Sequence, residues 1–180
     1  MTSDLRLDDL RREFRATSTK SMPIAGMIFW AIVGVAALFV RPVQLGYLVG
    51  FGSGMIFPLA ILIDRVSGGK VELASTDNPV TQMFMQSLAL VALMWPMVII
   101  AAVVAHDPIL VVLGGAILMG IIWIPYGWAA DDPVGIQHAI GRCILVYAAY
   151  LFVSPHYKAT AISVAVLLSY AYTLVRMRRG

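Results

Sequence analysis

Residues 83–105 read MFMQSLALVALMWPMVIIAAVVA and contain no Asp, Glu, Lys or Arg. A helix needs roughly 20 mostly apolar residues to cross a hydrocarbon core of about 30 Å. A charge-free run of this length predicts a membrane-spanning helix, because in lipid only a helix or a closed barrel satisfies its own backbone polar groups. This stretch therefore decides the class of the protein.

Five further stretches are also long, apolar and nearly free of charge. They are Pro23–Val40, Gln44–Ile63, Ile109–Trp128, Val134–Val153 and Ala159–Val175. The composition agrees, because only 13% of the residues are charged against about 25% in soluble proteins, and the mean hydropathy is +0.85. The sequence predicts an all-α, polytopic integral membrane protein, a six-transmembrane-helix bundle over residues 23–175.

Residues 1–22 differ from the rest, since they are polar and carry charges of both signs. Leu7, Leu10 and Phe14 recur at helical spacing and predict a short amphipathic helix, with Ser3 or Asp4 as its N-cap. A secretory signal is not expected, because it would run from a short basic region directly into an apolar core. The helix would lie either on the anionic inner leaflet or against the cytoplasmic surface of the protein itself.

The basic residues predict the orientation of the bundle. With six spans, the N-terminal segment, the second loop and the basic tail 176–180 share one side. That side holds Arg6, Arg11, Arg12, Arg15, Lys20, Arg65, Lys70, Arg176, Arg178 and Arg179. The opposite side holds Arg41 and Lys158. Cytoplasmic loops are enriched in Lys and Arg, so we expect a multi-pass protein of a bacterial inner (plasma) membrane with both termini in the cytoplasm.

Prolines interrupt three of the spans at Pro58, Pro96 and Pro125. Each removes a backbone hydrogen bond and frees a carbonyl one turn back. The resulting kinks would open a cavity or act as a hinge, or they are ordinary packing kinks. Asp64 follows Pro58 by six residues and Asp131 follows Pro125 by six, which is either a faint internal repeat or chance.

Arg142 is the most informative single residue, because an ionisable side chain inside a span is costly and normally faces the bundle or a wet cavity. It lies about 12 Å along the axis from Val134, at ~1.5 Å per residue. His138 precedes it by four residues and shares its face. We expect a ligand-binding or ion-pair cluster of Arg142, His138, Asp64, Asp131 and Asp132. The alternatives are a purely structural ion pair and an arginine that snorkels to the inner interface.

Other features favour structure over chemistry. Gly46, Gly50 and Gly54 recur every four residues, which favours tight packing within the bundle or a homo-oligomer face. No metal site or cofactor is expected, since His106, Asp107 and His156 lie on separate loops. Catalytic motifs such as His-Glu-x-x-His are absent. The sequence therefore favours a protein that is not an enzyme.

Two segments carry a family resemblance. Residues 51–63, FGSGMIFPLAILI, together with the charged N-terminal helix and a first span containing Gly26 and Trp30, resemble a bacterial family of small multispan membrane proteins of unknown function. The segment 124–128, IPYGW, is similar too. The resemblance implies a helical bundle in the inner membrane and transfers no catalytic residues.

These features favour a transporter-like or channel-like protein that binds or passes a small solute or ion through a cytoplasm-facing polar site around Arg142. A membrane protein that binds lipid or a protein partner without transport is the first alternative, and a membrane-embedded enzyme is the second. Membrane lipid is an expected partner. Nucleic acid is not, because the basic residues do not gather into one basic and aromatic face.

Overall fold

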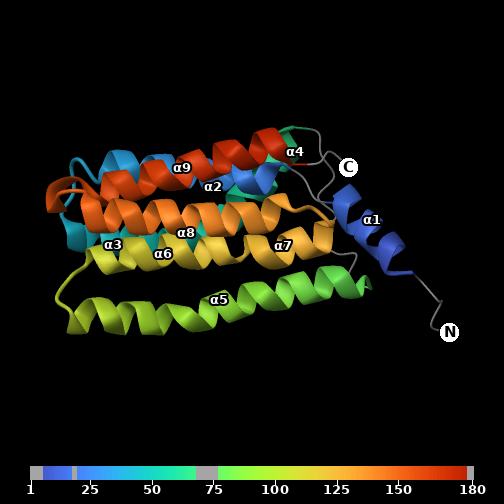
Figure 1. The fold of residues 1–180 in the computed structure, drawn as a ribbon, viewed down its shortest axis with the longest axis horizontal. Coiled ribbons are helices and arrows are strands. Elements are labelled where there is room, and N and C mark those ends of the chain that lie inside the picture. Colours follow the sequence, from blue (N-terminus) through green and yellow to red (C-terminus); the bar gives the residue numbers. More distant parts are fainter. Residues whose placement is uncertain (1–5, 18–19, 68–76, 178–180) are drawn as a thin grey trace.

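The computed structural model describes residues 6–17, 20–67 and 77–177, and within these ranges every regular element is a helix (Figure 1). The helices are α1 (Leu7–Thr17), α2 (Ser21–Ala36), α3 (Pro42–Gly52), α4 (Ile56–Val66), α5 (Pro79–Val104), α6 (Ile109–Ile121), α7 (Trp123–Ala130), α8 (Val134–Phe152) and α9 (Lys158–Arg176). Short 3-10 turns, η1 (Ser53–Met55) and η2 (Pro155–Tyr157), precede α4 and α9.

Five helical segments are long and apolar enough to cross a membrane. They are Pro42–Val66, Pro79–Val104, Ile109–Ala130, Val134–Phe152 and Pro155–Arg176, and a sixth is counted if the bent pair α1–α2 forms one span. Hydrogen-bonded turns carry the chain beyond α2, since Val40 N–H donates to the Ala36 carbonyl. All six predicted stretches are therefore helical, and the predicted all-α polytopic bundle is confirmed.

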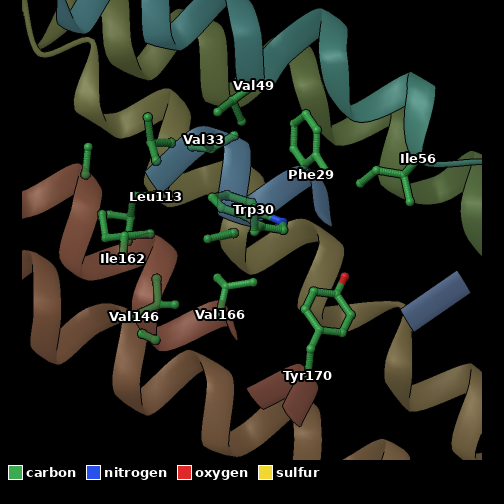
Figure 2. Packing of buried hydrophobic residues seen from close by; sticks show 14 of the residues in the cluster. Phe29, Trp30, Val33, Val49, Ile56, Leu113, Val146, Ile162, Val166 and Tyr170 are labelled. Atoms are coloured by element: carbon green, nitrogen blue, oxygen red, sulfur yellow. The ribbon is translucent and has the colours of Figure 1, made fainter. Parts of the chain in front are cut away.

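The spans run side by side, and α5 lies at the edge of the bundle (Figure 1). Helix α9 packs against both α2 and α8, and α6 contacts α3, α5, α8 and α9. The core between these helices is built from Trp30, Val49, Val146, Ile162 and Val166, all buried (Figure 2). Most side chains of α5 are exposed in the isolated chain, as expected for a helix that faces lipid.

Two glycine contacts fix how closely the helices approach. A Cβ on Gly26 of α2 would collide with the hydroxyl of Tyr170 on α9. A Cβ on Gly135 of α8 would collide with the Trp123 carbonyl and with Gly127 of α7. Small residues at such crossings let helix backbones come into contact, so the α2–α9 and α7–α8 pairs depend on these positions.

The three prolines have different effects on their helices. Pro58 is the third residue of α4, after η1, and Pro125 is the third residue of α7, after the break at Ile122. Both breaks lie beside the carbonyl that the proline leaves without its i+4 donor. Pro96 instead lies inside α5, which continues through it without a break. The spans that contain Pro58 and Pro125 end differently. Asp64 remains within α4, whereas Asp131 follows α7 and has a left-handed backbone with φ 51°.

The three glycines predicted to form one small-residue face have different surroundings. Gly46 packs against Val111, whereas a Cβ on Gly50 or Gly54 would meet nothing within 4 Å. Gly46 thus serves packing inside the bundle, and the other two glycines face outward.

One end of the bundle collects α1, the start of α2, the end of α4 and the end of α9 (Figure 1). Arg11, Arg15, Lys20, Arg65 and Arg176 belong to these segments, while Arg41 and Lys158 belong to the opposite end. The predicted N-caps Ser3 and Asp4, and the basic residues Lys70, Arg178 and Arg179, lie outside the described residues. The described part of the chain therefore keeps the charge asymmetry on which the predicted orientation depends.

Candidate functional site

Arg142 lies near the middle of α8 and is 0% exposed. Its guanidinium carbon lies 5.6 Å from the ring centre of Trp30 on α2 and 5.2 Å from that of Tyr170 on α9. Figure 2 shows these two rings among the buried side chains of the core. The side-chain stem passes Gly120 of α6, where a Cβ would lie 3.0 Å from Arg142 Cδ. Three neighbouring helices thus enclose the arginine.

His138 is the polar neighbour of Arg142. Nη1 of Arg142 lies 3.4 Å from Nε2 of His138, and Nδ1 of His138 lies 2.6 Å from the Thr173 hydroxyl. The guanidinium has only donors, so Nε2 accepts and the proton of the neutral imidazole is on Nδ1. The Thr173 hydroxyl in turn donates to the Ser169 carbonyl at 2.9 Å. This chain of hydrogen bonds runs from Arg142 into α9 and fixes the orientation of the imidazole, which also stacks on Trp123 at 4.4 Å.

The three carboxylates expected beside Arg142 are elsewhere. No ion pair within 4.0 Å joins Arg142 to a described carboxylate. Asp64 accepts from the Ser21 hydroxyl at 3.0 Å, Asp131 pairs with α1, and Asp132 accepts from the Val134 backbone N–H at 3.0 Å. The expected pairing of Arg142 with one of them was wrong. The carboxylates lie at the ends of helices, and Arg142 lies about 12 Å deeper along α8 at ~1.5 Å per residue.

The atoms of Arg142 are consequently not all paired. Its Nε and Nη2 are buried and have no hydrogen-bond partner among the described residues, and the same holds for Nε1 of Trp30. All three atoms are donors only. Buried, unpaired donors on a positively charged guanidinium complement an anion or an oxygen-rich solute.

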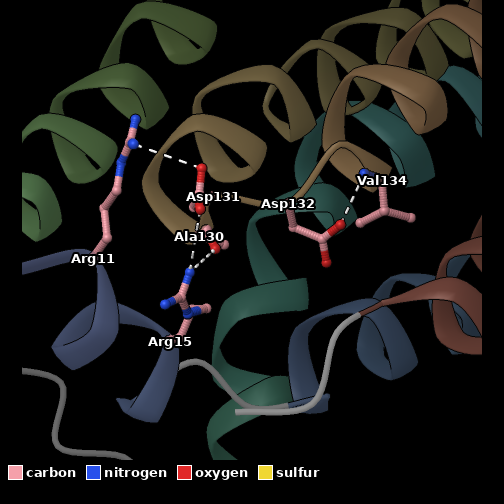
Figure 3. A network of polar contacts seen from close by, with 6 residues as sticks. All are labelled: Arg11, Arg15, Ala130, Asp131, Asp132 and Val134. Carbon is pink, nitrogen blue, oxygen red and sulfur yellow. Dashed lines mark hydrogen bonds and ion pairs between the residues drawn. The ribbon is translucent and has the colours of Figure 1, made fainter. Parts of the chain in front are cut away.

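A second polar cluster joins α1 to the end of α7 (Figure 3). Nη1 of Arg11 lies 3.6 Å from Oδ1 of Asp131, and Nη1 of Arg15 lies 3.8 Å from Oδ2 of the same residue. Arg15 also donates to the Ala130 carbonyl at 2.9 Å. Because arginines near a helix C-terminus satisfy its last carbonyls, α1 acts as a cap on α7.

Apolar and further polar contacts hold α1 in place. Phe14 is 4% exposed and packs edge-on against Phe84 of α5, with ring centres 5.5 Å apart. The Asn78 amide donates to the Leu10 carbonyl at 2.9 Å. Of the two placements considered for the amphipathic helix, the structure has it against the protein's own surface.

Beside this cluster is an open cavity of about 540 Å³, bounded by α1, α7 and α8. Arg11, Asp131 and Asp132 form its polar part, and Ile124, Trp128 and Ile136 form its apolar part. We refer to it as the Arg11 groove. The guanidinium of Arg11 lies 4.8 Å from the ring centre of Trp128, which fixes the positive charge at the groove wall.

Sequence reasoning brought Arg142 and His138 together but missed the side chains that surround them. These neighbours come from three other spans and are Trp30, Trp123, Tyr170 and Thr173. A hydropathy profile averages over whole spans and does not single such residues out. Aromatic residues placed deep inside spans, away from the interfaces where they are enriched, were the available signal. Among the described residues no three His, Cys, Asp or Glu side chains are grouped as a metal site would need.

Comparison with known proteins identifies a family for this chain but no reaction. The model of DUF7010, a family of unknown function, matches residues 7–179. Neither a curated protein nor a solved structure matches the chain.

Proposed function

The chain belongs to DUF7010, a family of unknown function, and we propose that it is a transporter-like or channel-like protein that binds a small anion around Arg142. In this proposal it lies in a bacterial inner membrane with both termini in the cytoplasm. The observation that carries the proposal is a fully buried guanidinium with two unpaired nitrogens and no carboxylate within 4.0 Å among the described residues.

The energetics favour a ligand at this position. Removing a charge from water costs several kcal/mol even after relaxation, and a cation–π contact returns about 2 kcal/mol when it is desolvated. Trp30 and Tyr170 therefore offset part of the cost, and His138 supplies one acceptor. A bound anion would neutralise the remaining charge and accept from Nε and Nη2.

Anion binding is tested by thermal unfolding in detergent. The purified protein is heated in sodium chloride, nitrate or formate, with gluconate as the bulky anion that keeps the ionic strength constant. At least one small anion should raise the Tm, because a ligand at 100 times its Kd stabilises by about 2.7 kcal/mol. Arg142→Gln should abolish the rise. Arg12→Gln is the matched control, since Arg12 is exposed on α1 and pairs with Asp9.

Passage is tested separately in proteoliposomes that contain the anion that stabilises the protein. Efflux measured with an ion-selective electrode should exceed that of empty liposomes and should fall in Arg142→Lys, because lysine keeps the charge but loses the planar fork of donors. A Tm rise that Arg142→Gln retains would contradict the site. Binding without efflux would leave a protein that binds the anion and does not transport it.

A further inference from the structure

The Arg11 groove carries an inference that is independent of Arg142. It lies at the end of the bundle that carries α1, next to the last turn of the span Ile109–Ala130. Trp128 in its wall is half-exposed, and tryptophans of this kind are enriched at membrane–water interfaces. The groove is therefore open where lipid headgroups meet the protein.

The charges of the groove have both signs, and their positions are fixed. Arg11 provides the cation, held by Trp128 at 4.8 Å and by Asp131 at 3.6 Å. Asp131 and Asp132 provide two carboxylates in the lining of the groove. Asp131 retains a side chain that is 60% exposed although it faces two arginines. A purely anionic headgroup would meet both carboxylates, whereas a zwitterion would match both signs.

The apolar side of the groove continues into the membrane-facing surface. Ile124 and Trp128 of α7 and Ile136 of α8 line the groove, and all three are exposed. Ile140 and Ile144 follow at intervals of four residues on α8, and both are exposed. Residues four apart lie on one helix face, so an apolar track leads from the charged groups towards the middle of the span.

We propose that the Arg11 groove binds a phospholipid whose zwitterionic headgroup ends in a primary ammonium. The phosphate accepts from the Arg11 guanidinium, which lines the groove. The ammonium donates to Asp131 and Asp132, and an acyl chain follows Ile136 and Ile140. A primary ammonium is favoured over a quaternary one, because only the former donates hydrogen bonds to carboxylates.

The test uses the delipidated full-length protein in detergent, with phosphatidylethanolamine, phosphatidylglycerol or phosphatidylcholine of identical acyl chains. The rise in Tm and the amount of lipid retained in native mass spectrometry are both measured. Phosphatidylethanolamine should give the larger rise and remain bound to the greater extent. An equal or larger effect of either other lipid would overturn the proposal.

Two variants examine the headgroup and the acyl chain separately. Asp131→Asn removes one carboxylate and suits the left-handed backbone at this position, because Asn tolerates it. Affinity for phosphatidylethanolamine should fall about tenfold with the loss of a charge-assisted contact, and the preference should move towards phosphatidylglycerol. Ile136→Trp fills the apolar side, leaves the α1 ion pairs intact, and should weaken the binding of all three lipids.

Asp9→Asn is the control, because it removes an equal charge from the outer face of α1, where Asp9 pairs with Arg12. Its lipid preference should equal that of the natural chain. An unchanged preference in Asp131→Asn, or unchanged binding in Ile136→Trp, would overturn the proposal. Neither result depends on the anion experiments, so failure at Arg142 and failure at the Arg11 groove are distinguishable.

Discussion

At Arg142 the aromatic rings of Trp30 and Tyr170 occupy the place where a carboxylate was expected. This changes what its removal should do. When a buried arginine is paired with a carboxylate, removal of the arginine leaves the carboxylate as an uncompensated buried charge. This lowers the free energy of unfolding by about 3–5 kcal/mol. Here the neighbours are neutral, so loss of the charge leaves only the space that the side chain filled.

Arg142→Met should therefore leave the Tm unchanged or raise it by a few degrees in gluconate buffer. Methionine fills most of the volume without a charge to desolvate, and replacing buried charges by apolar groups is often neutral or stabilising by about 1–4 kcal/mol. Arg142→Ala, measured in the same way, should lower the Tm because it leaves a cavity between α2, α6 and α9. A large destabilisation by methionine would indicate that the guanidinium is held by a charge that the present contacts do not include.

At the scale of the helices, the α7–α8 hairpin depends on close backbone contact. Asp132 caps α8 by accepting from Val134 N–H, and Gly127 faces Gly135 across the crossing. Arg15 caps the other side by donating to the Ala130 carbonyl. This hairpin positions His138, three residues after Gly135, and so connects the groove end of the molecule with the buried site.

Gly135→Ala should strongly lower the Tm, because its Cβ would collide with backbone atoms of α7 that have no room to move. Gly141→Ala is the matched control on the same helix, since its Cβ would meet nothing within 4 Å. It should leave the Tm unchanged or slightly higher, given that alanine favours a helix over glycine by about 1 kcal/mol. Equal effects of the two substitutions on thermal unfolding would contradict the observed helix crossing.

Sequence reasoning predicted the helices and the shared face of Arg142 and His138, but not the other neighbours of Arg142. Hydropathy and length identify a span because each depends on residues close in the chain. The enclosure of Arg142 depends instead on how α2, α6 and α9 rotate about their axes, and glycines such as Gly26 and Gly120 decide that rotation. Asp64 and Asp131 were predicted as partners of Arg142, and each follows a proline by six residues. Each lies at a helix end, however, where Asp64 contacts Ser21 and Asp131 contacts α1.

On the scale of the whole molecule, charge is distributed unevenly along the bundle axis. The end that carries α1 holds the ion pairs of Arg11 and Arg15 with Asp131, together with Lys20, Arg65 and Arg176. The other end holds Arg41 and Lys158 as its basic residues in the described chain. Since cytoplasmic segments are enriched in Lys and Arg, this asymmetry supports the proposed orientation, in which the α1 end would be cytoplasmic and the Arg11 groove would lie in the inner leaflet.

The orientation predicts which end a membrane-impermeant maleimide reaches. In a Cys143→Ser background, which removes the one natural thiol, single cysteines are placed at Arg12 on α1 and at Tyr157, the last residue of η2. Both positions are exposed. In intact spheroplasts Tyr157→Cys should be labelled and Arg12→Cys should not. In inside-out vesicles the pattern should reverse, because the proposed orientation has α1 on the cytoplasmic side. Labelling of Arg12→Cys in intact spheroplasts would invert the topology and move the Arg11 groove to the outer leaflet, while labelling of both sites there would contradict a bundle that spans the membrane with its two ends on opposite sides.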